Sequence, residues 1–243
     1  MKSIRADITG IGWVTTAGAG RGRVQREFGM PRGTLPDIRP ELVFDRPYPN
    51  LRRMDAYSRL GLTAIGLALK DAGLDAWSEK RTIGIVSATV HGCLGADINY
   101  YETVIPDRGA HASPAVFSYT SANSFLGEAA IHFGLTGVNF VLSEEIRTGL
   151  SGISSALLHL AGGNTTGILG GFCDIGCPDL FKQRDTVSPA AVFCMLQNGG
   201  DNPRPSLGSL TLSSEGDLLL NDSPVDDLSL LVRQCLAANT LFD

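Results

Sequence analysis

The stretch GLTGVNFVLSEEIRTGL, residues 134–150, decides the fold of this chain. Its first part predicts a strand over residues 139–142, and Thr148 then opens a helix that runs to Ala161 without a charged residue. A strand that passes through a tight turn into such a helix usually presents a nucleophile at the turn. The segment therefore indicates both an α/β fold and the place where a catalytic side chain belongs.

Strands and helices alternate on both sides of this segment. Strands are predicted over residues 4–14, 82–87, 165–171, 190–196 and 206–212, and helices over 55–73, 94–104 and 124–133. Asp55 is expected to cap the first of these helices and Gly73 to end it. Ser223-Pro224 is expected to cap a final amphipathic helix, with an apolar face of Val225, Leu228, Leu231, Val232 and Leu236. The alternation predicts an α/β fold whose sheet is covered on both faces.

Length and charge favour one globular domain followed by a short tail. The 243 residues are 43% hydrophobic, which suits one large domain over residues 1–198. An acidic tail over residues 199–243 is expected to pack on that domain. This tail holds seven acidic residues and two arginines, so it accounts for the whole net charge of −5. No basic stripe points to nucleic acid.

Targeting signals and cofactor motifs are not apparent in the sequence. The first residues lack the apolar core of a signal peptide, and no apolar run reaches the length of a membrane span, so we predict a cytoplasmic protein with reduced cysteines. Gly10 and Gly12 lack the third glycine of a dinucleotide loop. Cys173 and Cys177 lack the second ligand pair of a zinc site. We therefore predict no cofactor and no metal.

Several separated motifs resemble the β-ketoacyl synthases, the condensing enzymes of fatty-acid and polyketide synthesis. They are the opening strand ITGIGWVT at 8–15, the helix that begins RRMDAYSRL at 52–60, and the decisive segment at 134–150. The resemblance extends from about Ile4 to Leu196. It implies a thiolase-like α/β fold. The chain would hold only the N-terminal half of this fold. That half would be a mixed sheet of five strands with helices on both faces, followed by a short C-terminal strand and helix.

The same resemblance places the family's catalytic cysteine at Ile146. Isoleucine has no nucleophilic atom, so a covalent thioester cannot form at this position. The histidines of the family's second half cannot be located either. We therefore interpret the chain as an accessory or chain-length-factor-like subunit in fatty-acid or polyketide-type synthesis.

Two alternatives stay open at this stage. The first is acyl transfer or condensation through a relocated thiol, either Cys173 after a central strand or Cys93 in a His-Gly-Cys loop with His91. An ordinary buried cysteine explains each of them more simply. The second is a homodimer that binds an acyl group or acyl carrier protein without chemistry.

The resemblance also assigns surfaces to partners. Arg52 and Arg53 match the basic residues that dock acidic acyl carrier protein, although a solvated helix start explains them nearly as well. The family's dimer interface maps to Asn123, Phe133, Asn139, Phe140, Val141 and Leu142. A homodimer, or a heterodimer with a full-length ketosynthase, is therefore expected.

Two further expectations concern the turn over residues 143–148, here called the nucleophile turn, and the helix after it. Glu144, Glu145 and Arg147 are expected to be surface charges or an ion pair. The uncharged helix is expected to need burial on all sides. Leaving its five large apolar side chains exposed would cost on the order of 10 kcal/mol, so the tail or another chain must cover it. These side chains are Leu150, Ile153, Leu157, Leu158 and Leu160.

Overall fold

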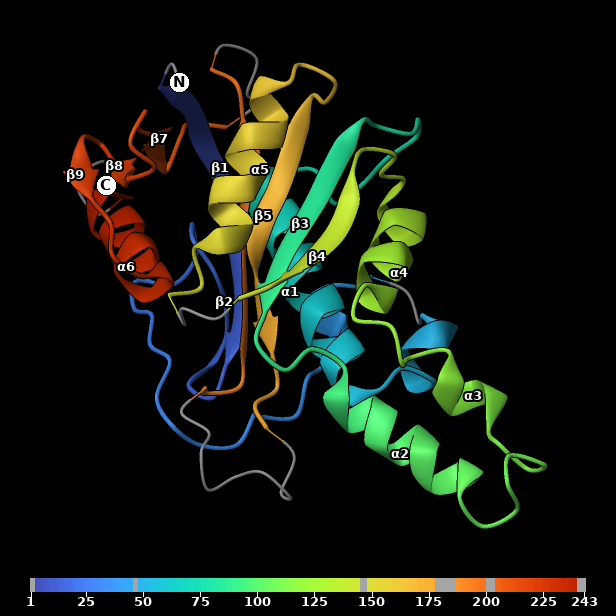
Figure 1. Cartoon of the computed structure of the whole chain (residues 1–243). Coiled ribbons are helices and arrows are strands. Elements are labelled where there is room, and N and C mark those ends of the chain that lie inside the picture. Colours follow the sequence, from blue (N-terminus) through green and yellow to red (C-terminus); the bar gives the residue numbers. More distant parts are fainter. Residues whose placement is uncertain (1–2, 46–47, 145–147, 178–186, 200–203, 240–243) are drawn as a thin grey trace.

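A computed structural model describes residues 3–45, 48–144, 148–177, 187–199 and 204–239. One nine-stranded mixed sheet runs through these residues, in the order β4-β3-β5-β6-β1-β7-β8-β9, with β2 paired to β1 (Figure 1). The strands are β1 Ile4–Thr15, β2 Gly18–Arg21, β3 Ile83–Thr89, β4 Asn139–Ser143, β5 Gly167–Asp174, β6 Ala190–Gln197, β7 Gly208–Leu212, β8 Leu218–Leu220 and β9 Ser223–Pro224.

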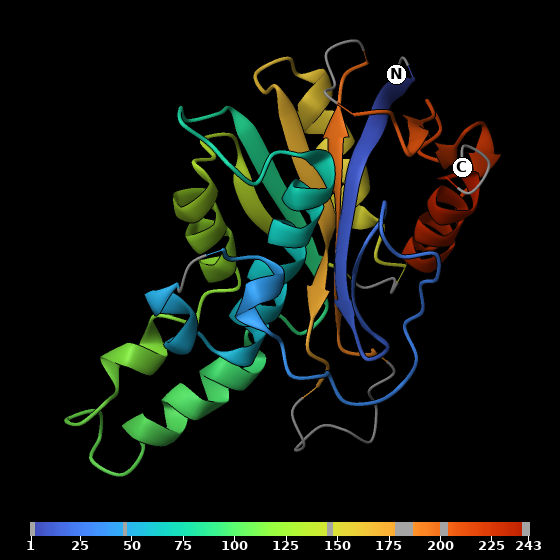
Figure 2. The same cartoon turned by 180° about the vertical axis from the view of Figure 1, so that it is seen from behind.

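Helices cover both faces of this sheet, which confirms the predicted α/β class. They are α1 Ala56–Ala72, α2 Leu94–Val104, α3 Pro114–Phe117, α4 Ser124–Phe133, α5 Ser151–Ala161 and α6 Leu228–Asn239, with short 3₁₀ turns η1 Pro40–Leu42 and η2 Pro49–Arg52. Helices α1 and α4 lie on one face, and α5 and α6 lie on the other (Figures 1 and 2). Helices α2 and α3 project away from the sheet as an arm.

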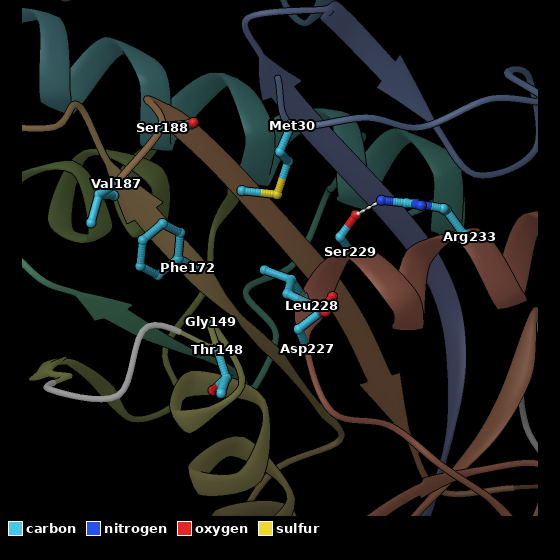
Figure 3. A pocket seen from close by; sticks show the side chains of 10 residues that line it. All are labelled: Met30, Thr148, Gly149, Phe172, Val187, Ser188, Asp227, Leu228, Ser229 and Arg233. Carbon is cyan, nitrogen blue, oxygen red and sulfur yellow. Dashed lines mark hydrogen bonds between the residues drawn. The ribbon is translucent and has the colours of Figure 1, made fainter. Parts of the chain in front are cut away.

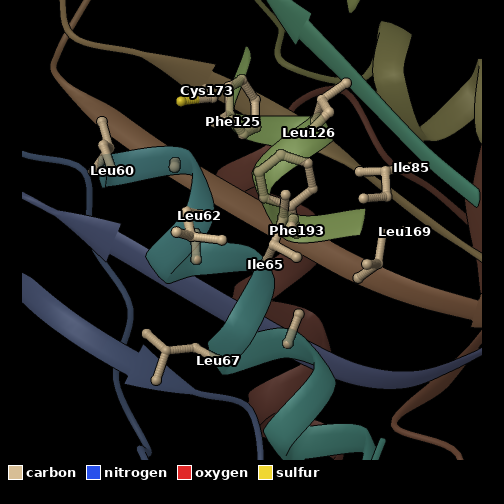
Figure 4. Close-up of a cluster of buried hydrophobic side chains, with 14 of the residues drawn as sticks. Leu60, Leu62, Ile65, Leu67, Ile85, Phe125, Leu126, Leu169, Cys173 and Phe193 are labelled. Atoms are coloured by element: carbon tan, nitrogen blue, oxygen red, sulfur yellow. The ribbon is translucent and has the colours of Figure 1, made fainter. Parts of the chain in front are cut away.

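Helix α1 is the centre of one hydrophobic core (Figure 4). The side chain of Asp55 accepts a hydrogen bond from the Ser58 backbone amide at 2.9 Å, and Gly73 ends the helix with φ of 73°, which confirms both predicted boundaries. The helix lies directly against β1, because a Cβ atom at Gly12 would stand 2.1 Å from the Ala68 nitrogen. Glycine at this position lets helix and strand backbones meet.

The central five strands, β4, β3, β5, β6 and β1, form the expected mixed sheet. Strand β3 is parallel to both β4 and β5, whereas β6 is antiparallel to β5 and β1. Strands β7, β8 and β9 extend this sheet beyond β1. The boundary at residue 198 stays a prediction, although β7 pairs directly with β1.

The start of the last helix differs from the prediction. Ser223-Pro224 forms the short strand β9 rather than a helix cap. The cap is Asp227, whose carboxylate accepts a hydrogen bond from the Leu230 amide at 2.7 Å. The predicted cap was wrong because Ser-Pro is a helix-start signal, whereas this segment pairs with β8 in a hairpin.

Helix α5 also corrects an expectation. Its apolar side chains Ile153, Leu157 and Leu160 are at most 1% exposed, because they face this chain's own sheet. Leu158 is the exception at 44% exposure. Leu150 is also buried, so four of the five apolar side chains are covered within this chain, and only the expected burial on all sides is wrong. The tail contributes to this cover, since Leu228, Leu231, Val232 and Leu236 of α6 belong to the same hydrophobic cluster as α5.

Within the described part of the chain, every helix is too short or too polar to cross a membrane.

Candidate functional site

The carboxyl ends of three parallel strands form the candidate site. Strands β4, β3 and β5 are neighbours that run in the same direction, so their last residues meet at one edge of the sheet. His91 follows β3, Glu144 follows β4, and Asp174 is the last residue of β5. The Glu144 backbone amide donates to the Thr89 carbonyl at 2.8 Å, which ties two of these strand ends together.

Asp174 is a fully buried carboxylate that organises the loop after β3. Its Oδ2 atom accepts hydrogen bonds from the Thr89 hydroxyl at 3.0 Å, the Val90 amide at 2.9 Å and the His91 amide at 2.7 Å. Its Oδ1 atom accepts one from the Gly176 amide at 2.7 Å and lies 3.1 Å from Nδ1 of His91. These donors compensate the burial of a charge. The carboxylate therefore fixes both the loop and the orientation of the imidazole.

Glu144 is buried rather than at the surface, which corrects the expectation for this residue. It is 4% exposed, and its Oε1 atom accepts hydrogen bonds from the Thr148 hydroxyl at 2.9 Å and the Gly149 amide at 3.0 Å. Among the described residues its Oε2 atom has no hydrogen-bond partner. The carboxylate thus bridges the two sides of the nucleophile turn. Ile146, Glu145 and Arg147 lie outside the described residues.

The two candidate thiols lie on the α1 side of the sheet. Cys173 is buried in the core cluster of Figure 4, with its Sγ atom 3.8 Å from the Tyr57 carbonyl oxygen of α1, and burial raises the pKa of its thiol well above the usual range. Burial, followed by the nearby Asp97 carboxylate, raises the pKa of Cys93 to about 11. The thiolate is the nucleophilic form of cysteine. These surroundings therefore disfavour the reactive state of both residues.

The predicted docking arginines are both exposed. Arg52 is the last residue of η2, and Arg53 follows it, three residues before the start of α1. Arg59, one turn into the helix, is also exposed. The three arginines are therefore accessible near the start of α1.

The residues of the predicted dimer interface fall into two groups. Strand β4 lies at one end of the sheet and pairs only with β3 among the described strands, and its residues from Asn139 to Leu142 are partly exposed. Asn123, before α4, is exposed. Phe133, in contrast, is 2% exposed and packs in this chain's own core, so its side chain is not available to a partner.

The sequence reasoning missed a cavity of about 470 Å³ between the nucleophile turn and the tail. Figure 3 shows the side chains that surround it. They are Met30, Thr148, Gly149, Phe172, Val187, Ser188, Asp227, Leu228, Ser229 and Arg233. No local signal in the sequence marks this cavity, because it depends on the return of the tail to the turn. In the described part of the chain, no group of three or more His, Cys, Asp or Glu side chains could hold a metal ion.

Comparison with known proteins gives one family and one partial relative. The family described as "Beta-ketoacyl synthase, N-terminal domain" matches residues 36–190, more than half of the chain. The 3-oxoacyl-[acyl-carrier-protein] synthase 2 of Vibrio cholerae serotype O1 is 29% identical over 121 residues. That alignment covers 49% of this chain and 29% of the Vibrio enzyme, so the chain spans less than a third of this relative.

Solved structures share the fold at low identity. The ishigamide ketosynthase/chain length factor has a TM-score of 0.68 at 16% identity, over 86% of this chain and 62% of that one. The ketosynthase ApeO in complex with its chain length factor ApeC, from Xenorhabdus doucetiae, has a TM-score of 0.58 at 17% identity, over 82% and 81%. The AntDE:AntF complex, a type II polyketide synthase acyl carrier protein with its ketosynthase, has a TM-score of 0.62 at 15% identity, over 86% and 62%. Identities this low establish the common fold alone.

Proposed function

Because the chain belongs to the β-ketoacyl synthase family, we propose that it is a non-catalytic, chain-length-factor-like subunit that pairs with a catalytic ketosynthase. Two of the structures that share its fold are described as a ketosynthase with a chain length factor. The proposal extends that arrangement to this chain, which spans only part of most of these relatives.

The open edge of strand β4 is the observation that carries the proposal. An edge strand presents unpaired backbone groups that can pair with a second chain. Phe140, Val141 and Leu142 are only partly buried, and nearby α4 presents Ile131 at 76% exposure. Exposed apolar residues beside an open strand edge are typical of an interaction surface. On the other face of the sheet, residues of the tail helix α6 already share a hydrophobic cluster with α5, and Leu158 is the large apolar side chain of α5 that stays exposed.

The chemistry of the strand ends also favours a non-catalytic role over a relocated thiol. The resemblance to the family places its nucleophile at Ile146, whose side chain has no nucleophilic atom. The candidate thiols Cys93 and Cys173 both have raised pKa values. A condensing enzyme needs an activated nucleophile, which usually means a lowered pKa or an adjacent base.

Arg52 and Arg53 support a second part of the proposal, the docking of an acidic acyl carrier protein. Both are exposed at the start of α1, beside Arg59. Charged surfaces of opposite sign speed encounter and fix orientation. The R52E/R53E double variant is expected to weaken the binding of carrier protein and to reduce the salt dependence of that binding. R108E, an exposed arginine in the loop between α2 and α3, is the control.

The main proposal is tested by sedimentation velocity of the purified chain, alone and mixed with the catalytic ketosynthases of the same organism. The expected result is a one-to-one complex that the Ile131→Glu variant weakens. The Val24→Glu variant is the control, because Val24 is also an exposed apolar residue, at 54%, but lies after β2. A stable homodimer that excludes every ketosynthase would instead support the homodimer hypothesis. A monomer with no complex would refute both.

A further inference from the structure

A dipeptide at the end of strand β6 combines a side-chain amide with an accessible backbone nitrogen. Asn198 directly follows Gln197, the last residue of β6, and Gly199 lies in the turn that begins there. Both residues are exposed to solvent. Asn198 is also the only asparagine in the sequence that is followed by glycine.

The hydrogen bonds around β6 stop one residue before this dipeptide. The Thr9 hydroxyl donates to the side-chain oxygen of Gln197 at 2.7 Å, and Gln197 is paired with Asp7 of β1. Within the part of the chain that the structure describes, neither the Asn198 side chain nor the Gly199 N–H group makes a hydrogen bond. The sheet therefore fixes Gln197 but leaves the next two residues without such restraint.

Other asparagines lack this combination of features. Each of them precedes a residue that carries a side chain. Asn221 is also held in place, because its side-chain oxygen accepts a hydrogen bond from the Ser209 amide at 2.9 Å. Asn164 lies in an exposed loop, as Asn198 does, but the branched side chain of Thr165 follows it. Asn164 is therefore a matched internal control.

We propose that Asn198 is a site of spontaneous deamidation. The Gly199 nitrogen loses its proton and attacks Cγ of Asn198. A new C–N bond forms, the bond from Cγ to Nδ2 breaks, and ammonia leaves after taking up a proton. Water then opens the resulting succinimide ring at one of its two carbonyl groups, which yields aspartate or isoaspartate. Glycine favours this attack because no Cβ atom shields its nitrogen. The reaction needs only water, so it does not depend on the proposed pairing with a ketosynthase.

The product changes both the charge and the backbone at this end of the sheet. A Cβ atom at Gly199 would stand 3.3 Å from Oδ2 of Asp7, so an existing carboxylate lies beside the turn. Deamidation adds a second negative charge next to it, and like charges across paired strands are destabilising. Isoaspartate also adds a methylene group to the main chain directly after the pair of Asp7 and Gln197. The modified protein is therefore expected to pair β1 with β6 less firmly.

Incubation of the full chain at pH 8 and 37 °C tests the proposal. Peptide mass spectrometry follows the mass gain of amide-to-acid conversion, and digestion with a protease that cleaves at aspartate but not at isoaspartate separates the two products. We expect Asn198 to convert at a similar rate in the native protein and in guanidinium-unfolded protein. Asn164 is expected to stay largely unmodified over the time in which half of Asn198 is converted. Conversion of Asn198 in the unfolded protein alone, or equally fast conversion of Asn164, would overturn the proposal.

Two variants test the role of the glycine and the effect of the product. The φ of Gly199 is not positive, so Gly199→Val suits the backbone, and Asn198 is expected to stay unmodified in this variant over the same time. Freshly purified Asn198→Asp carries the new charge without the longer backbone. The incubated natural protein is expected to unfold at a lower temperature than this variant. Circular dichroism verifies that both variants are folded. Conversion of Gly199→Val as fast as the natural protein would refute the attack by the glycine nitrogen, and equal unfolding temperatures would refute the backbone effect.

Discussion

Nδ1 of His91 lies 3.1 Å from Oδ1 of Asp174, and the carboxylate is completely buried while the imidazole side chain is 14% exposed. The pair joins the end of β5 to the loop after β3. Because Asp174 also accepts three backbone amides, the loop depends on this one carboxylate.

Replacement of Asp174 by Asn should therefore destabilise the fold. The variant places an NH₂ group where an oxygen accepted hydrogen bonds, so we expect the free energy of unfolding to fall by about 2–4 kcal/mol in urea denaturation. Asp107→Asn is the control, because Asp107 pairs with His111 in an Asp–His contact of 2.9 Å whose side chains are 56% and 81% exposed. That variant should stay within about 0.5 kcal/mol. Equal stability of both variants would contradict the structural role of Asp174.

The thiols should react slowly in the folded protein. Burial raises the pKa of Cys93 from 9.0 to about 11, so at pH 8 its thiolate fraction is about 100-fold below that of an ordinary cysteine. Iodoacetamide labelling followed by peptide mass spectrometry should show that Cys93 is alkylated about 100-fold more slowly in the native protein than in urea-unfolded protein. The labelling rate of the native protein should still rise from pH 8 to pH 10. Cys173 should label more slowly still. Native labelling at pH 7 as fast as in urea would revive the relocated-thiol hypothesis.

His132 should make stability depend on pH. Its ring packs against Phe44, Tyr48 and Phe133 at centroid distances of 4.7–4.8 Å, and burial lowers the pKa of its imidazole below 6.5. As the pH falls through about 6.5, the unfolded chain takes up the proton first, so the free energy of unfolding decreases. Urea denaturation at pH 7.5 and pH 5.5 should show a smaller decrease for His132→Phe than for the natural protein. The same decrease in both would contradict this account.

Two glycines in helices should respond in opposite directions to alanine. A Cβ atom at Gly152 in α5 would stand 2.0 Å from the Gly171 carbonyl oxygen, so Gly152→Ala must push the helix off the sheet, at a cost of about 1–3 kcal/mol or more. A Cβ atom at Gly127 in α4 would meet nothing within 4 Å. Gly127→Ala should therefore stabilise the protein by about 0.5–1 kcal/mol, because alanine favours the helix. Thermal unfolding of both variants checks the signs, and a shift in the same direction would refute the close contact of α5 and β5.

Local signals in the sequence identified most of the fold. Helix α1 begins after Asp55 and ends at Gly73, as predicted, because a cap and a left-handed glycine act within one helical turn. The signals failed where a distant segment decides the outcome. Ser223-Pro224 reads as a helix start, yet pairing with β8 makes it a strand.

The candidate site was less predictable for the same physical reason. The sequence gives the position of Glu144 in a turn but not its burial, which depends on Thr89, Thr148 and Gly149. The cavity could not be foreseen either. It exists because α6 returns to the nucleophile turn, and hydrophobic periodicity identifies an apolar helix face without naming what it packs against.

Strand β1 opens the described chain and yet lies inside the sheet. Asp7 pairs with Gln197 of β6 and Ile4 with Leu212 of β7, so its neighbours come from the opposite end of the sequence. Pairings this distant in sequence are slow to form. During synthesis, β1 remains without its neighbours β6 and β7, and before they emerge its apolar side chains can pack only against earlier elements such as β2, α1 and α5. In the nascent chain, strand β1 therefore lacks two of its sheet neighbours until residue 212 has been synthesised, which favours aggregation over this interval.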